Sequence, residues 1–327
     1  MSMRQIPGCG NWRIRYEQKN SGIAILRAET CDAEAVLPEE LLGLPVTELG
    51  DYALAARDQG TRGAELEMIG RRTDQEAEWS NRRMRSLRLP CGIRRIGNYA
   101  FMGAFYMERF EFCDEPVEWG VSPFMNCMAL HEIIVNRPGE DQGGLAKICG
   151  ETDRELDVQI RDASGMRARL LFPEYAEIWE ENTPARQFDH TTDGAGYPYH
   201  HVFRDRRLHW KDYDGLWEKS RERGGIEDVL TRLAWFRLRW PEGLEEQRRR
   251  AYLEYVTENR ERLMRWVLEN GDGTDLSRLL EIVVYTPQQL REGCDFARES
   301  GEVQSLAVLL SRLRGEQPAG RRKRFEL

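Results

Sequence analysis

The sequence predicts an α/β repeat fold, in which a solenoid of short parallel strands is followed by an all-α C-terminal domain. Three observations support this prediction. Apolar residues recur with a 23-residue period from Met84 onward, a glycine and a phenylalanine recur at the same interval, and the apolar spacing becomes helical after Tyr213. A fixed period of this length is typical of solenoids, because each repeat buries its apolar face only against its neighbours. The expected parts are a solenoid (1–165), a cap and irregular aromatic seam (166–211), a helical domain (212–315) and a basic tail (316–327).

Each repeat begins with a short strand of the pattern L-x-x-L-x-L. The last two apolar positions are two residues apart, so both side chains point to one face of the strand. Strands stacked in this register form a parallel sheet with an apolar inner face. The triplets are Met84, Leu87 and Leu89, then Met107, Phe110 and Phe112, then Leu130, Ile133 and Val135, with Leu156 and Val158 as a further 23-residue step.

The second half of each repeat turns at a glycine and then buries an aromatic ring. Gly97 and Phe101 have counterparts in Gly120 and Phe124. A glycine permits a tight backbone that other residues obstruct. An earlier copy, Leu37-Pro38 followed by Gly50-Asp-Tyr-Ala-Leu54, matches Leu89-Pro90 followed by Gly97-Asn-Tyr-Ala-Phe101.

These residues resemble the BspA-like class of leucine-rich repeats of bacterial proteins. The resemblance covers roughly residues 10–160 and implies a curved leucine-rich-repeat solenoid used for protein–protein contact, often at a cell surface. One departure concerns Leu66 to Leu89, which are separated by the same period but lack the Gly-x-x-Ala-Phe turn between them. The quoted segments are Val36-Leu-Pro-Glu39, Leu44-Pro-Val-Thr-Glu-Leu-Gly-Asp-Tyr-Ala53, and Leu89-Pro90 with Ile96-Gly-Asn-Tyr-Ala-Phe101.

Composition argues against a membrane protein. Charged residues make up 32% of the chain, and no apolar run approaches the roughly 20 residues of a membrane helix. The N-terminal residues contain no apolar core of signal-peptide length, so the predicted location is cytoplasmic, and a surface location requires a leader that has been removed. The formal net charge of -8 argues against nucleic acid as the partner.

The seven cysteines suggest neither a disulfide framework nor a metal ribbon. They are scattered along the chain without a Cys-x-x-Cys motif. Both kinds of site need closer, paired spacing. Free thiols are therefore expected.

The outer face of the predicted sheet is the candidate partner-binding surface. The period places Arg85 beside Glu108, Arg88 beside Glu111, and Arg109 beside Glu132 on adjacent strands. These opposite charges either satisfy one another or, extended by His131 and Ile134, form a mixed polar surface for a partner. We predict a non-catalytic protein-interaction module without a cofactor. The sequence identifies neither the partner nor the oligomeric state.

The seam at residues 182–210 offers an alternative, an enzyme or metal protein. Four histidines lie within it, but their separations match no common metal-ligand spacing. The alternative therefore requires that the four side chains converge in space. They are His190, His200, His201 and His209. The Gly and Pro content of the seam predicts irregular structure, preceded by a strand at 166–172 and a short helix at 174–181.

Helices are expected through the C-terminal domain. Thr286-Pro-Gln-Gln289 combines an N-cap, a first-turn proline and a capping-box glutamine. Ala297-Arg-Glu-Ser-Gly301 and Leu268-Glu-Asn-Gly271 resemble ankyrin helix pairs. A third functional alternative is nucleic-acid contact, if Arg248 to Arg250 form one basic face with the tail Gly320-Arg-Arg-Lys-Arg324.

Overall fold

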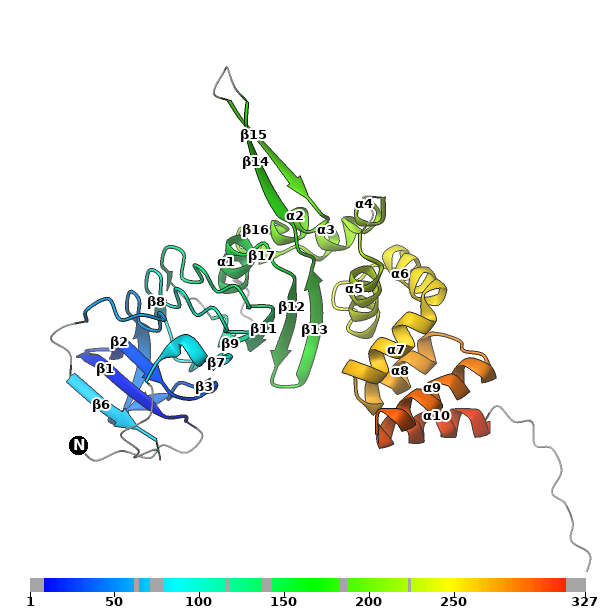
Figure 1. The fold of residues 1–327 in the computed structure, drawn as a ribbon, viewed down its shortest axis with the longest axis horizontal. Helices are drawn as coiled ribbons and strands as arrows, with labels where there is room; N and C mark the ends of the chain where they lie inside the picture. Colours follow the sequence, from blue (N-terminus) through cyan, green and yellow to red (C-terminus); the bar gives the residue numbers. More distant parts are fainter. Residues whose placement is uncertain are drawn as a thin grey trace, which may run out of the picture. The chain divides into compact units, whose positions relative to one another are not determined.

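A computed structural model describes residues 9–61, 65–70, 79–115, 118–136, 143–182, 187–222 and 225–315. The chain divides into two compact units, residues 1–224 and 225–327. This division falls later in the chain than residue 212, at which the change of periodicity led us to expect the helical domain to begin. Unit 1 contains the strands and unit 2 is helical (Figure 1).

The predicted parallel sheet forms the core of unit 1. Five strands run parallel and a sixth, β13, closes the sheet antiparallel to β12. Every member of the apolar triplets is buried, including Leu87, Phe110 and Ile133. The α/β solenoid fold is thereby confirmed. In spatial order the strands of this sheet, called sheet B, are β3 (Glu34–Val36), β7 (Ser86–Arg88), β9 (Arg109–Cys113), β11 (Glu132–Asn136), β12 (Leu156–Asp162) and β13 (Gly165–Phe172).

The register of sheet B keeps the 23-residue period in its middle and departs from it at both ends. Leu87 pairs with Phe110 and Phe110 with Ile133, as predicted. Ile133 then pairs with Val158 and not with Leu156, so the predicted 23-residue step at this point is wrong. The connection here contains helix α1 (Gly143–Glu151), which lengthens the repeat. Because the shift is two positions, the same side chains still face the core.

A second sheet, sheet A, forms another side of the solenoid. Its parallel strands are β2 (Gly22–Thr30), β5 (Leu44–Leu49), β8 (Arg95–Ile96) and β10 (Glu118–Trp119), and β4 (Glu40–Leu41) pairs with β5. Antiparallel strands β1 (Trp12–Lys19) and β6 (Glu65–Ile69) extend the sheet beyond β2.

The segment from Leu66 to Leu89 is not a turn of the solenoid. Its strand β6 pairs with β1 in sheet A, and β7 stacks directly on β3, with Ala35 opposite Leu87. Without the Gly-x-x-Ala-Phe turn, this segment cannot repeat the geometry of its neighbours. The segment between β5 and β7 therefore adds strand β6 to the edge of sheet A, beside β1.

A column of glycines explains how closely the turns stack. A Cβ on Gly97 would lie 2.4 Å from the backbone carbon of Gly50, and one on Gly120 would lie 2.5 Å from the backbone nitrogen of Asn98. Any other side chain would separate the turns. Beneath this column Phe101 stacks on Phe124, with ring centroids 5.0 Å apart.

Two of the cysteines are joined, so the prediction of free thiols is wrong for them. Cys91 and Cys113 form a disulfide, with Cα atoms 5.0 Å apart. Their sequence separation of 22 is close to the repeat length, which places them on neighbouring turns. The other cysteines are free, and they are Cys9, Cys31, Cys127, Cys149 and Cys294.

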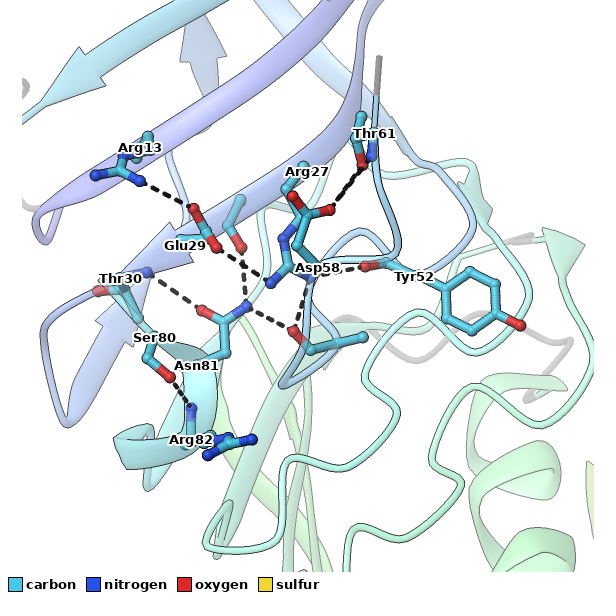
Figure 2. A network of polar contacts seen from close by, with 12 residues as sticks. Arg13, Arg27, Glu29, Thr30, Tyr52, Asp58, Thr61, Ser80, Asn81 and Arg82 are labelled. Carbon is cyan, nitrogen blue, oxygen red and sulfur yellow. Dashed lines mark hydrogen bonds and ion pairs between the residues drawn. The ribbon is translucent and has the colours of Figure 1, made fainter. Parts of the chain in front are cut away.

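The first turn of the solenoid is capped by two buried polar side chains (Figure 2). In later turns a backbone carbonyl accepts a hydrogen bond from a backbone N–H of the preceding turn. The Ala100 carbonyl, for example, accepts one from the Leu54 N–H. In the first turn the Ala53 carbonyl still accepts from a backbone donor, the Ala28 N–H at 2.7 Å, but side chains bond the carbonyls on either side of it. Arg27 donates from Nη1 to the carbonyls of Tyr52 and Ala55, at 3.1 and 2.7 Å.

Asn81 is the second of these capping residues and is fully buried. Its side-chain amide donates to the carbonyls of Ala28 (2.9 Å) and Ala55 (3.3 Å). Its side-chain oxygen accepts from the Thr30 N–H. These bonds satisfy backbone atoms that would otherwise be buried without partners.

Residues 176–182 and 187–193 pair as two β-strands where the sequence predicted a helix and irregular structure. Strand β14 (Ala176–Asn182) pairs antiparallel with β15 (Gln187–Asp193). Both predictions are wrong, because each strand is stabilised by its partner and not by its own local pattern. Strand β13, in contrast, lies where it was expected. Short elements follow: α2 (Gly196–His200), β16 (Phe203–Arg204), β17 (Arg207–Leu208), α3 (Trp210–Gly215) and α4 (Trp217–Glu222).

Helix α3 protects the open edge of sheet B. The hydroxyl of Tyr213, fully buried, donates to the carbonyl of Leu171 at 2.6 Å and accepts from the Leu171 N–H at 3.2 Å. Leu171 lies on β13, the edge strand. An exposed strand edge can pair with other chains, and this contact blocks that at one position.

Unit 2 consists of helices that pack in consecutive pairs (Figure 1). Helix α5 packs on α6, α7 on α8, and α9 on α10, while α7 also contacts α5 and α9. The predicted capping box is present, since Thr286 and Gln289 each bond the other's backbone N–H. The helices are α5 (Glu227–Arg239), α6 (Glu246–Glu258), α7 (Arg260–Asn270), α8 (Gly273–Ile282), α9 (Pro287–Glu299) and α10 (Val303–Gly315).

Candidate functional site

The outer face of sheet B carries a ladder of charged side chains from successive strands. The Arg85 guanidinium forms an ion pair with Glu108, and Arg109 Nε lies 2.7 Å from Glu132 Oε2. By accepting this hydrogen bond, Glu132 raises the pKa of the Arg109 guanidinium. Both pairs lie where the 23-residue period placed them. Such exposed cross-strand pairs each contribute about 0.2–1 kcal/mol.

The third expected pair, between the described residues Arg88 and Glu111, does not form. The two residues are neighbours in the register of β7 and β9, but Glu111 accepts a hydrogen bond of 2.7 Å from the side-chain amide of Asn136. The Arg88 side chain is exposed. A cationic group therefore stands on this face beside a carboxylate that is bonded elsewhere.

Ile134 contributes less to this surface than the sequence suggested. Its side chain points to the outer face, yet it is only 3% exposed. On the neighbouring strands the long side chains of Glu111 and Gln159 flank it, because both residues pair with Ile134 in the register. Ile134 therefore offers little surface to a partner. His131 is exposed, and its Nδ1 lies 2.8 Å from the carbonyl oxygen of Ala129.

The ladder extends further than the sequence indicated. Gln159 donates from Nε2 to Glu132 at 3.0 Å, and Asp157 is held by Arg169 through two hydrogen bonds of 2.8 and 2.6 Å. These residues were missed because the last step is longer than the period. A search that allowed a short insertion at α1 would have found them.

The histidines of the 182–210 seam do not converge. His190 stacks on Trp179 and His201 on Tyr197, each with centroids 4.2 Å apart, while His209 is exposed beside Asp212. Within the described residues, no three His, Cys, Asp or Glu side chains are placed to hold a metal ion. The convergence that the metal-site alternative requires is therefore not found among the described residues.

His200 is buried between two backbone carbonyls. Its Nδ1 lies 3.0 Å from the Cys149 oxygen and its Nε2 lies 3.0 Å from the Pro173 oxygen. Burial lowers the pKa of His200 below the ordinary value, because charging the ring inside the protein costs free energy. The imidazole joins α2 to the end of β13.

This lowered pKa predicts a pH dependence of stability. The unfolded chain takes up a proton at His200 near pH 6.5, whereas the folded chain does so only at lower pH. The stability contributed by neutral His200 is therefore present above about pH 6.5 and is lost as the pH falls toward the folded pKa. Hydrogen exchange of unit 1 at a series of pH values between about 7 and 5 measures this loss. His200→Gln should flatten the dependence, and an equal slope in both proteins would contradict the assignment.

The nucleic-acid alternative rests on residues of α6 and the tail. Arg250 is already paired with Glu246, with Nε 3.1 Å from Oε1. The tail residues Gly320–Arg324 lie outside the described residues. Contact with nucleic acid therefore stays a prediction. Among the helices described, none is both long and apolar enough to cross a membrane.

Comparisons with known proteins are sparse. No protein-family model matches the sequence, and no curated protein matches it. Among solved structures, a leucine-rich repeat protein of T. pallidum is similar, with 20% identity and a TM-score of 0.25. The alignment covers 37% of this chain and 50% of that one, so this chain spans half the length of its structural match. The solenoid is therefore established by its own strand register and buried triplets.

Proposed function

We propose that unit 1 is a protein-interaction module and that the outer face of sheet B is its contact surface. The observation that carries this proposal is the exposed charge ladder on a parallel sheet. Arg85 and Arg109 have side-chain exposures of 61% and 51%, and Arg88 stands beside them without an ion pair to Glu111. The resemblance to BspA-like leucine-rich repeats supports the same function, because solenoids commonly bind partners through exposed strand faces.

The charges on this face have two possible roles, which a charge exchange separates. Arg85→Glu combined with Glu108→Arg preserves the ion pair while inverting the pattern that a partner meets. If the charges only satisfy one another, the exchange leaves both stability and binding unchanged. If a partner contacts them, binding falls while stability is kept.

The chain offers a matched control outside sheet B, with Arg94 just before β8 and Glu115 in the connection from β9 to β10. Arg94 Nη1 lies 2.6 Å from Glu115 Oε2, and their exposures of 55% and 34% resemble the 61% and 42% of Arg85 and Glu108. Arg94→Glu with Glu115→Arg therefore applies the same chemical change away from sheet B.

The test is affinity capture from a lysate of the source organism after nuclease treatment. The baits are the intact chain, the Arg85/Glu108 exchange, and the Arg94/Glu115 exchange, and all three have the same net charge. We expect a protein that the intact chain and the control retain and the sheet B variant loses. Retention of the same proteins by all three baits would contradict the proposed surface.

A further inference from the structure

The disulfide between Cys91 and Cys113 lies at one end of the proposed contact surface. Side chains of β9 alternate between the two faces of sheet B, so Cys113 lies on the same outer face as Arg109 and Glu111. Cys91 follows the end of β7 in the sequence. The bond therefore joins the ends of two strands, β7 and β9, whose charged side chains belong to this surface.

The bond stands where the hydrogen-bonded ladder between these two strands ends. Strands β7 and β9 share three register pairs, of which Arg88 and Glu111 are the last, whereas β9 and β11 share five. One further hydrogen bond follows, from the Leu89 N–H to the Glu111 carbonyl at 2.9 Å. The next residue is Pro90, which has no N–H to donate. Beyond Leu89 the disulfide takes the place of the ladder in holding the two strand ends together.

The same two turns are also held together away from the disulfide. The N–H groups of Tyr99, Phe101 and Gly103 each donate to a carbonyl of the next turn at 2.9 Å. On the other side of the disulfide, Arg94 Nη1 lies 2.6 Å from Glu115 Oε2. Because these contacts do not depend on the disulfide, we expect its cleavage to release the ends of β7 and β9 while the solenoid stays folded.

The two sulfur atoms differ in their access to solvent. Cys91 is half-buried, whereas Cys113 is only 6% exposed. A small thiol in solution, reacting as its thiolate, therefore attacks Cys91 Sγ, forms a mixed disulfide there and releases Cys113 as a thiolate that takes up a proton. A second thiol then displaces Cys91, which is also protonated. The two reductant thiols leave joined as a disulfide, so two electrons and two protons have passed to the protein.

The remaining cysteines favour a bond that is made and broken over a permanent one. A disulfide framework ties most of the cysteines of a domain in pairs, but here one pair is bonded among seven cysteines. Cys9 and Cys31 are free although both are only half-buried. A single bond with an accessible sulfur, in a chain that keeps other accessible thiols free, is typical of redox-responsive disulfides.

We propose that Cys91–Cys113 is a redox switch that controls binding at the outer face of sheet B, an inference that rests on the proposed function of this face. In the oxidised chain the bond holds Arg88 and Glu111 in place, because they form the last pair of the ladder beside it. Reduction releases the strand ends, so these two charges no longer keep a fixed separation. A partner that matches the charges of the oxidised face then binds less tightly.

Peptide mapping of the full chain after alkylation tests whether the bond is reversible. We expect Cys91 and Cys113 to be joined in oxidised glutathione, to become alkylated after incubation with about 10 mM reduced glutathione, and to rejoin on reoxidation. In Cys113→Ser, the accessible Cys91 should form a mixed disulfide with glutathione. A bond that stays intact in reduced glutathione, or that never forms in oxidised glutathione, would overturn the proposal.

Hydrogen exchange of the oxidised and reduced chains measures the local effect. On reduction, protection of the Leu89 amide should fall at least about tenfold, and that of Tyr99, which links the same two turns elsewhere, by less than about twofold. Cys91→Ser with Cys113→Ser should behave as the reduced chain under both conditions. Unchanged protection of Leu89, or an equal loss at Tyr99, would show that the bond does not control this corner of the sheet.

Binding is measured by calorimetric titration of the captured partner without added reductant, so that the partner itself is not altered. Cys91→Ser with Cys113→Ser should weaken the Kd by at least about fivefold relative to the oxidised wild type. Cys9→Ser with Cys31→Ser is the control and should bind as the wild type does. If only the Cys91/Cys113 variant fails to change the Kd, the switch is contradicted. If the charge exchange on sheet B also fails to change it, the proposed function falls as well.

Discussion

Phe110→Ala is expected to destabilise unit 1 by about 3–5 kcal/mol, the range for truncating a buried phenylalanine. The Phe110 side chain is fully buried at the centre of sheet B. Its ring lies 5.2 Å from that of Phe101, 5.3 Å from Phe112 and 5.0 Å from Phe124, measured between centroids. These rings belong to successive turns, so a cavity at Phe110 removes contacts between repeats as well as within one.

Hydrogen exchange of the β9 and β11 amides measures this loss, because it reports the opening free energy of unit 1 separately from that of unit 2. Phe105→Ala is the control, since Phe105 lies in the adjacent turn but is 49% exposed. Its expected effect is below about 1 kcal/mol. A loss of that size for Phe110→Ala would show that the stacked register is wrong.

Asn81→Ala is expected to cost about 2–4 kcal/mol, because it leaves buried backbone groups without partners. The Thr30 N–H would lose the bond that Figure 2 shows to the Asn81 side chain. The Ala28 carbonyl would lose its bond of 2.9 Å from the Asn81 amide. Arg27 still bonds Ala55, so that carbonyl remains satisfied. The change should open the N-terminal cap before the central turns.

The same exchange measurement resolves this order. Amides of β2 and β3 should lose protection first, with those of β11 affected less. Asn136→Ala is the control, because Asn136 is half-buried and bonds a side chain on the outer face. Equal effects of the two substitutions, or uniform loss of protection along unit 1, would contradict the capping role of Asn81.

The period of the apolar triplets was enough to predict the middle of the solenoid. Leu87, Phe110 and Ile133 stack as their spacing requires, because a strand can bury two alternate side chains in only one register. The steps at either end could not be predicted in the same way. Helix α1 lengthens the step to Val158, and the excursion containing β6 places Ala35 next to Leu87. An insertion that shifts the register by two positions superposes the alternating apolar pattern on itself, so a fixed period does not reveal it.

Ion pairs on the outer face of sheet B were predictable only between residues one 23-residue period apart. Arg85–Glu108 and Arg109–Glu132 follow from the period alone. The partner of Glu111 does not, because Asn136 reaches it diagonally from the next strand. The burial of Ile134 could not be foreseen either, since long neighbouring side chains cover an outward-facing position. The β14–β15 pair was missed because each strand depends on its partner.

The affinity of the captured partner for three purified chains tests the central claim most directly. Calorimetric titration would compare the wild type with the Arg85/Glu108 exchange and with the Arg94/Glu115 exchange. We predict a Kd at least about tenfold weaker for the sheet B variant, equivalent to about 1.4 kcal/mol, and an unchanged Kd for the control. Equal affinities for all three chains would contradict the assignment of sheet B as the contact surface.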